Sequence, residues 1–146
     1  MTWRIGEMLV QKKLISWEQL QEALEEQKKT RELTGEILVR KGFVSRHLVY
    51  KTLAEQAHLR YVDLKKIRIN QVAVEQLPRE IACRYSIMPI ELDESRLTVA
   101  VPGPMHTWPE SEIMTLMKLS AIQTVLCLPE DIQWALEAYY GAKEEG

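Results

Sequence analysis

Two stretches near the start of the chain place hydrophobic residues at helical spacing, and the second stretch repeats the first. Residues 4–27 and 33–56 align without a gap at an offset of 29 residues. In each copy, a short run with apolar residues three or four positions apart precedes a longer run of the same kind. The pattern predicts two tandem helix pairs, because one helix pair alone cannot bury its apolar face.

Capping and turn residues indicate where these helices begin and end. Ser16, followed three residues later by Gln19, predicts a capping box at the start of the first long helix. In the second copy, Gly42 is expected to end the short helix in a left-handed conformation, and Ser45 to cap the long one. The polar residues 28–32 predict a five-residue connection between the copies.

The pattern changes after about residue 57 from helical spacing to a mixture of short alternating runs and helices. The predicted elements are an extended segment at 61–64, helical turns at 69–76 and after Pro78, strands at 86–92, 96–103 and 122–128, and helices at 109–120 and 129–141. We therefore expect an α+β fold. A helical N-terminal subdomain of two tandem helix-pair repeats (1–57) precedes a small α/β C-terminal subdomain (58–146).

Composition argues against several classes of function. The chain has 146 residues, 46% of them apolar, and neither a signal peptide nor an apolar run long enough to span a bilayer, so we expect a cytoplasmic location without membrane insertion. A net charge of −2 with only a slight positive excess in the repeats does not favour nucleic-acid binding. Cys83 and Cys127 are interpreted as buried thiols, and no metal-ligand spacing appears. Motifs for phosphate loops and for nucleophilic or metal-dependent catalysis are missing as well, so we expect no enzyme.

The repeated residues resemble a known family. The motif residues of the first copy are Arg4, Gly6, Leu9, Ile15, Leu20, Leu24 and Gln27. They look like the 24-residue motif of the MshEN domain, the N-terminal domain of secretion and pilus-assembly ATPases, in which the motif occurs twice with a five-residue spacer. The later segments YVDL, LPREIACRYSIMPIEL, RLTVAV and AYYG also resemble landmarks of that domain, in the same order.

The resemblance implies a ligand, because the family binds the second messenger cyclic di-GMP between its two motifs. The binding residues that it implies here are Arg4, Ile5, Gly6, Leu9, Leu24, Gln27, Arg31, Leu33, Thr34, Gly35, Leu38, Leu53 and Gln56. An arginine can donate two parallel hydrogen bonds to a guanine edge or to a phosphate. No metal is implied, and the ligand would act as a signal rather than as a catalytic cofactor.

Two positions depart from the family pattern. Leu33 stands where the second motif usually has an arginine, and Arg31 lies two residues upstream as a candidate substitute. Gly103 precedes Pro104 where the family often has an acidic residue. We therefore expect asymmetric binding that is weaker than in typical members of the family.

Two interpretations of the repeat remain open at this stage. In the first, the chain is a cyclic di-GMP sensor attached to an ATPase or another effector domain in the same parent chain, with a membrane-platform protein as a further partner. In the second, it is an adaptor that docks an ATPase onto such a platform without binding nucleotide. Packing alone can also explain motif residues such as Leu9 and Leu20, and Gly6 can serve close helix contact.

Overall fold

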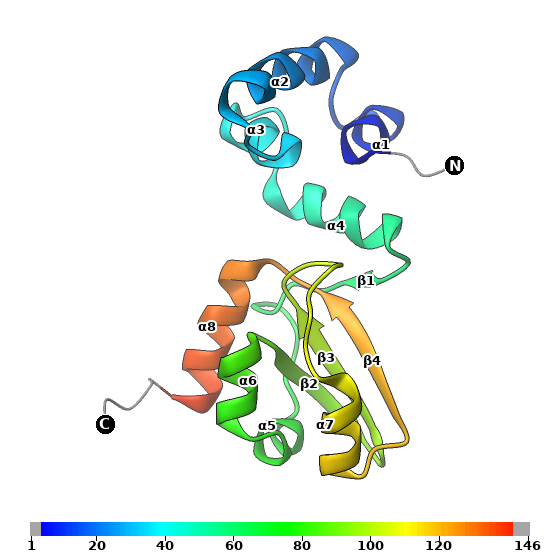
Figure 1. The fold of residues 1–146 in the computed structure, drawn as a ribbon, viewed down its shortest axis with the longest axis vertical. Coiled ribbons are helices and arrows are strands. Elements are labelled where there is room, and N and C mark those ends of the chain that lie inside the picture. The colour runs from blue at the N-terminus through cyan, green and yellow to red at the C-terminus, as the bar shows by residue number, and fades with distance from the viewer. Residues whose placement is uncertain (1–3, 142–146) are drawn as a thin grey trace. The chain divides into compact units, whose positions relative to one another are not determined.

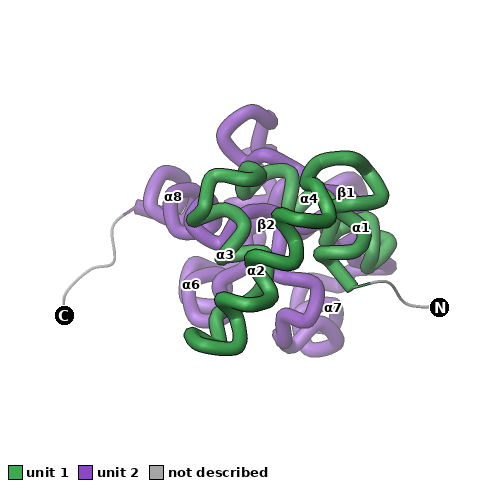
Figure 2. Tube along the Cα trace, turned by 90° about the horizontal axis from the view of Figure 1, so that it is seen from above, with its two compact units in different colours: residues 1–58 green, residues 59–146 purple. Residues whose placement is uncertain are grey.

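The structure, a computed structural model, describes residues 4–141 and divides into two compact units (Figures 1 and 2). Unit 1 comprises Met1–His58 and unit 2 comprises Leu59–Gly146. Helices alone make up the described part of unit 1 apart from its turns, whereas unit 2 combines helices with a four-stranded sheet. The predicted α+β fold class is confirmed. Within residues 4–141, every helix is too short or too polar to traverse a lipid bilayer.

The four helices of unit 1 preserve the sequence repeat. They are α1 (Ile5–Gln11), α2 (Trp17–Thr30), α3 (Thr34–Arg40) and α4 (Arg46–Gln56). Helices α3 and α4 begin at the positions that the 29-residue offset assigns to the starts of α1 and α2. The repeat in sequence is therefore a repeat of helix pairs.

The expected capping signals operate in both copies. Ser16 Oγ accepts a hydrogen bond of 3.1 Å from the Gln19 backbone N–H, and Gln19 Oε1 accepts one of 2.9 Å from the Ser16 N–H, which completes the capping box. In the second copy, Ser45 Oγ accepts from the Leu48 N–H at 3.2 Å. Gly42 has a φ of +78°, as its predicted place after the short helix requires.

The predicted five-residue connection at 28–32 was wrong, because α2 continues to Thr30. Nothing in the segment breaks a helix, since it contains neither glycine nor proline. Thr30 Oγ1 donates to the Glu26 carbonyl one turn earlier, at 3.3 Å. The helix ends at Arg31, which adopts a left-handed conformation with a φ of +62°.

Hydrophobic residues from all four helices form the core of unit 1. Its buried members are Leu9, Ile15, Leu20, Ala23, Ile37, Leu38 and Val49. The prediction that most apolar motif residues serve packing is confirmed for Leu9, Ile15 and Leu20. One helix pair supplies only part of this core, so the two copies stabilise each other.

Ion pairs on the surface of unit 1 connect α2 with α3. Glu26 Oε2 lies 3.0 Å from Lys41 Nζ and 3.4 Å from a guanidinium nitrogen of Arg40. The Lys41 ammonium, with Arg40 as a weaker contributor, holds the pKa of the Glu26 carboxyl below its ordinary value of 4.5. The charged form of Glu26 is therefore favoured by the folded state.

We expect unit 1 to lose stability at acidic pH partly through Glu26. A carboxyl with a lowered pKa contributes stability above its unfolded pKa of about 4.5, and this contribution disappears as the pH falls through the folded value. Urea midpoints measured between pH 6 and pH 3 should fall less steeply for Glu26→Gln than for the wild type. Lys41→Gln should flatten the curve in the same way, and an unchanged slope in both variants would contradict this role of the pair.

Unit 2 is a mixed sheet packed with helices. Its strands are β1 (Arg60–Tyr61), β2 (Met88–Asp93), β3 (Arg96–Val101) and β4 (Ala121–Leu126), in the order β1-β4-β3-β2. Strand β4 runs parallel to both β1 and β3, and β2 pairs antiparallel with β3. The helices are α5 (Gln71–Gln76), α6 (Arg79–Tyr85), α7 (Glu110–Met117) and α8 (Pro129–Tyr140). Of the extended segment predicted at 61–64, only Tyr61 belongs to a strand, the two-residue β1.

The prediction of two buried thiols was right for one cysteine and wrong for the other. Cys127 is buried after β4, and burial raises the pKa of its thiol. Cys83 is exposed, because α6 turns the neighbouring Ala82 toward the interior instead.

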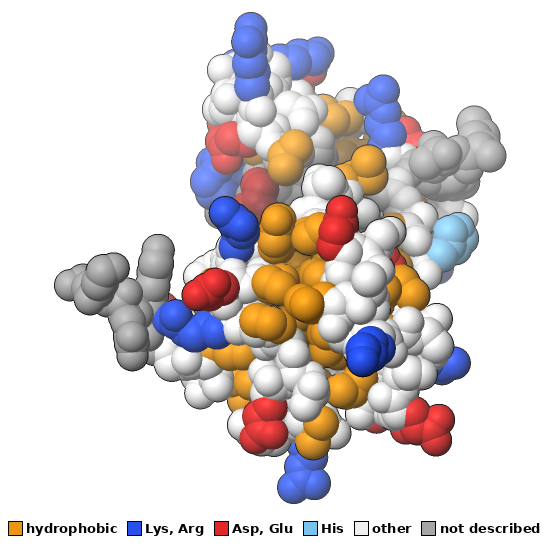
Figure 3. All heavy atoms as spheres, turned by 60° about the horizontal axis from the view of Figure 1, so that its bottom comes forward, with side chains coloured by type: hydrophobic (Ala, Val, Ile, Leu, Met, Phe, Trp, Pro, Cys, Tyr) orange, Lys and Arg blue, Asp and Glu red, His pale blue; other side chains and the backbone are white. Residues whose placement is uncertain are grey.

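Unit 2 also exposes hydrophobic side chains. Figure 3 shows them gathered on one face, and a groove between α6 and α7 contains Tyr85, Ile113 and Leu116 among its lining residues. All residues that line this groove belong to unit 2, so it is separate from the two predicted motifs.

Candidate ligand-binding site

A pocket of about 490 Å³ lies within unit 1 and receives residues from all four of its helices or their caps. Its volume falls in the range of roughly 300–1,000 Å³ that is usual for small-molecule sites. The lining residues are Arg4, Ile5, Gly6, Glu7, Trp17, Leu20, Leu24, Gln27, Leu33, Thr34, Gly35, Glu36, Val49, Tyr50, Leu53 and Gln56. All of these residues belong to the two repeated stretches, 4–27 and 33–56.

The wall of this pocket is repeated in the same way as the sequence. Pairs related by the 29-residue offset line it together: Arg4 and Leu33, Ile5 and Thr34, Gly6 and Gly35, Glu7 and Glu36, Leu20 and Val49, Leu24 and Leu53, Gln27 and Gln56. We call the wall residues of 4–27 the first half-site and those of 33–56 the second half-site. A pocket with two equivalent halves suits a ligand that itself has two similar halves.

Most of the binding residues inferred from the sequence lie on this wall. They are Arg4, Ile5, Gly6, Leu24, Gln27, Leu33, Thr34, Gly35, Leu53 and Gln56. Leu9 and Leu38 are not on the wall, because both side chains are 0% exposed and pack into the core. Arg31 is not on the wall either, and its backbone serves as the C-terminal cap of α2.

The two glycines bring each short helix close to a long one. A Cβ atom added to Gly6 would lie 2.5 Å from Leu20 Cδ1, and one added to Gly35 would lie 3.0 Å from Val49 Cγ1. Both neighbours are core residues that also border the pocket. Close helix contact therefore accounts for the glycines.

Gln27 links the two motifs to each other. Its side-chain Nε2 donates a hydrogen bond of 3.0 Å to the backbone carbonyl of Glu32, which directly precedes the second half-site. This hydrogen bond fixes the backbone of the short connection between α2 and α3. The same side chain also borders the pocket.

The largest chemical difference between the half-sites is at Arg4 and Leu33. Both residues are N-caps, of α1 and α3 respectively, and both have extended backbone conformations. Arg4 is exposed and forms no ion pair with another residue of 4–141. Leu33 is 73% exposed although it is apolar. The first half-site therefore offers a guanidinium where the second offers a hydrocarbon side chain.

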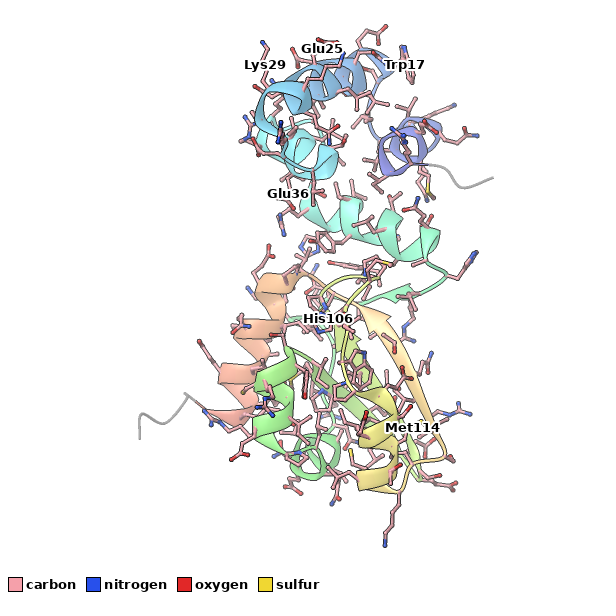
Figure 4. The ribbon with its side chains drawn as sticks, in the orientation of Figure 1. Trp17, Glu25, Lys29, Glu36, His106 and Met114 are labelled. Carbon is pink, nitrogen blue, oxygen red and sulfur yellow. The ribbon has the colours of Figure 1, made fainter. Side chains whose placement is uncertain are left out.

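Sequence reasoning missed several wall residues. They are Glu7, Trp17, Leu20, Glu36, Val49 and Tyr50. The repeat itself could have identified Glu7 with Glu36, because glutamate recurs beside each motif glycine. Trp17, labelled in Figure 4 at the start of α2, is 55% exposed. Within residues 4–141, no cluster of side chains suited to binding a metal ion accompanies these residues.

Comparison with known proteins identifies the family. The model of the MshEN domain matches residues 57–146, which include all of unit 2. The chain belongs to the MshEN domain family. The match does not depend on the repeats, so it supports the resemblance of the motifs through a separate part of the chain.

Curated relatives of this MshEN domain are much longer proteins. The type IV pilus assembly ATPase PilB of Myxococcus xanthus is 29% identical over 143 residues, which cover 98% of this chain and 25% of that protein. The PilB of Thermus thermophilus is 41% identical over 104 residues, which cover 70% of this chain and 12% of that protein. The chain thus spans a quarter or less of these relatives.

Solved structures share the fold of both units. A structure of MshE with cyclic di-GMP has a TM-score of 0.74 and 26% identity, and the match covers 94% of this chain and 99% of the other. The N-terminal domain of XpsE matches with a TM-score of 0.58 and 20% identity, covering 94% of each chain, which shows similarity of fold alone.

Proposed function

We propose that this MshEN domain is a non-catalytic regulatory domain that binds cyclic di-GMP in the pocket of unit 1. The observation that carries the proposal is the wall of that pocket, to which the same positions of both motifs contribute. The similarity to MshE, solved with cyclic di-GMP, supports the choice of ligand.

The chemistry of the wall suits such a ligand. Cyclic di-GMP consists of two guanosine halves joined through two phosphates into one ring with two-fold symmetry. Aliphatic side chains such as Ile5, Leu24 and Leu53 can contact bases and sugars, and exposed Trp17 offers a stacking surface. Arg4 can donate to a guanine edge or to a phosphate.

The proposed context is a larger cytoplasmic protein. The PilB relatives suggest that an ATPase domain belongs to the same parent chain, and that ligand binding here regulates that domain. A membrane-platform protein of the pilus or secretion machinery is the proposed further partner. Nucleic acid is not a proposed partner, because the chain carries a net charge of −2.

Isothermal titration calorimetry of the chain with cyclic di-GMP tests the proposal. We expect saturable binding of one ligand per chain and much weaker binding of GTP and cyclic GMP, because a mononucleotide can occupy only one half-site. Emission from Trp17 should change on binding, and this change should be lost in Trp17→Phe. If cyclic di-GMP gives no heat at high concentration, the proposal is wrong and the adaptor interpretation is favoured.

A further inference from the structure

The two half-sites differ in where each copy places its arginine. The first copy has Arg4 before its short helix and Trp17 at the first position of its long helix. The second copy has Leu33 and Arg46 at the two corresponding positions. Each copy therefore has one arginine at these two positions. The first copy has it before the short helix, and the second copy has it at the start of the long helix.

Arg46 forms an ion pair with a residue on the wall of the second half-site. Its Nη1 donates to Glu36 Oε1 at 3.0 Å and to Glu36 Oε2 at 2.9 Å. Its guanidinium carbon also lies 5.3 Å from the centre of the Tyr50 ring, within reach of a cation–π contact. Both Glu36 and Tyr50 line the pocket, and Figure 4 labels Glu36 on α3.

Among the residues that the structure describes, the first half-site has no counterpart of this ion pair. Glu7 corresponds to Glu36, but Trp17 occupies the position that corresponds to Arg46 and carries no charge. Each copy nevertheless has one wall carboxylate and one arginine at this pair of positions: Arg4 lines the pocket itself, whereas Arg46 binds the wall carboxylate Glu36.

We propose that Arg46, which does not itself line the pocket, supplies the positive charge for the second half-site: it neutralises Glu36 and so allows a ligand with two phosphates to occupy that half of the pocket. This inference rests on the proposed function. Without Arg46, the Glu36 carboxylate would stand unneutralised on the wall and repel an anionic ligand. Because Arg46 is only partly exposed, water and salt screen this effect less than at a fully exposed site.

Arg46→Gln should weaken the binding of cyclic di-GMP about tenfold. Arg40→Gln is the matched control, since Arg40 also pairs with glutamates in unit 1, but neither partner, Glu26 or Glu32, lines the pocket, and the affinity of this variant should equal that of the wild type. Glu36→Gln should bind more tightly than the wild type, because it removes the negative charge and leaves the arginine. If the ion pair acted only by stabilising the fold, Arg46→Gln and Glu36→Gln would both weaken binding.

Two further measurements separate charge from structure. The affinity gap between Arg46→Gln and the wild type should narrow as salt is raised, because ions screen the repulsion. Adding Leu33→Arg to Arg46→Gln should restore most of the affinity, since it places a cation on the wall of the same half-site at an exposed position. Melting temperatures identify any variant that has lost its fold.

The outcomes distinguish this inference from the proposed function. If the wild type binds and Arg46→Gln binds equally well, the inference is overturned and the proposed function stands. A loss of affinity that is independent of salt and is not rescued by Leu33→Arg would also overturn it. Failure of the wild type to bind cyclic di-GMP would overturn both.

Discussion

Replacing Arg4 with alanine is expected to weaken the binding of cyclic di-GMP by about tenfold to a hundredfold, with little change in the melting temperature. Arg4 is exposed on the pocket wall and forms no ion pair with the other residues of 4–141, so its loss removes no ion pair from the fold. One bidentate contact from an arginine to guanine is worth about 1–3 kcal/mol, and about 1.4 kcal/mol corresponds to a factor of ten. Calorimetry and thermal unfolding of the same samples measure the two effects.

Arg31→Ala is the matched control for this variant. It removes one arginine from the same unit, but Arg31 is not among the residues of the pocket wall. We expect its affinity to remain within about twofold of the wild type, since surface charges off the site are largely screened. Equal affinities for Arg4→Ala and the wild type would remove Arg4 from the binding site.

Much of the pocket wall could be predicted because the chain repeats itself. Residues 29 positions apart occupy equivalent positions in the two helix pairs and line the pocket together, as Gly6 and Gly35 or Gln27 and Gln56 do. The helix caps at Ser16 and Ser45 could also be predicted from the sequence. Each serine oxygen accepts a hydrogen bond from the backbone N–H three residues later, so the signal for the cap lies within four residues of the chain.

Helical spacing could not separate the wall from the core. Leu9 and Leu24 both lie on apolar faces, but Leu9 is fully buried whereas Leu24 is only partly buried and borders the pocket. Which apolar residue remains accessible depends on how the neighbouring helix packs, and a period of 3.6 residues carries no information about that.

Other wall residues carry no signal in the repeat. Trp17 corresponds to Arg46, and Tyr50 corresponds to Gln21, so neither aromatic recurs in the other copy.

The short strand β1 illustrates a similar limit in unit 2. Its Arg60 pairs with Val125, and a partner so distant in sequence cannot be inferred from the alternation of a few residues.

Leu33→Arg is expected to tighten the binding of cyclic di-GMP by about tenfold, which would be the opposite outcome to that of Arg4→Ala. The new guanidinium would stand in the second half-site at the position that Arg4 occupies in the first, and one charge-assisted bidentate contact is worth about 1–3 kcal/mol. Leu33 is 73% exposed, so the arginine would not be buried without a partner and the fold should be retained.

The control for this gain is Leu48→Arg, which adds the same charge to unit 1 at a partly exposed position away from the pocket wall. If general attraction between a more positive domain and an anionic ligand caused the gain, both variants would tighten binding equally, and raised salt would abolish the effect. A local contact predicts a larger gain for Leu33→Arg than for Leu48→Arg. A stable Leu33→Arg protein with wild-type affinity would show that the two half-sites do not engage the ligand equivalently, and the symmetric model of the pocket would have to be abandoned.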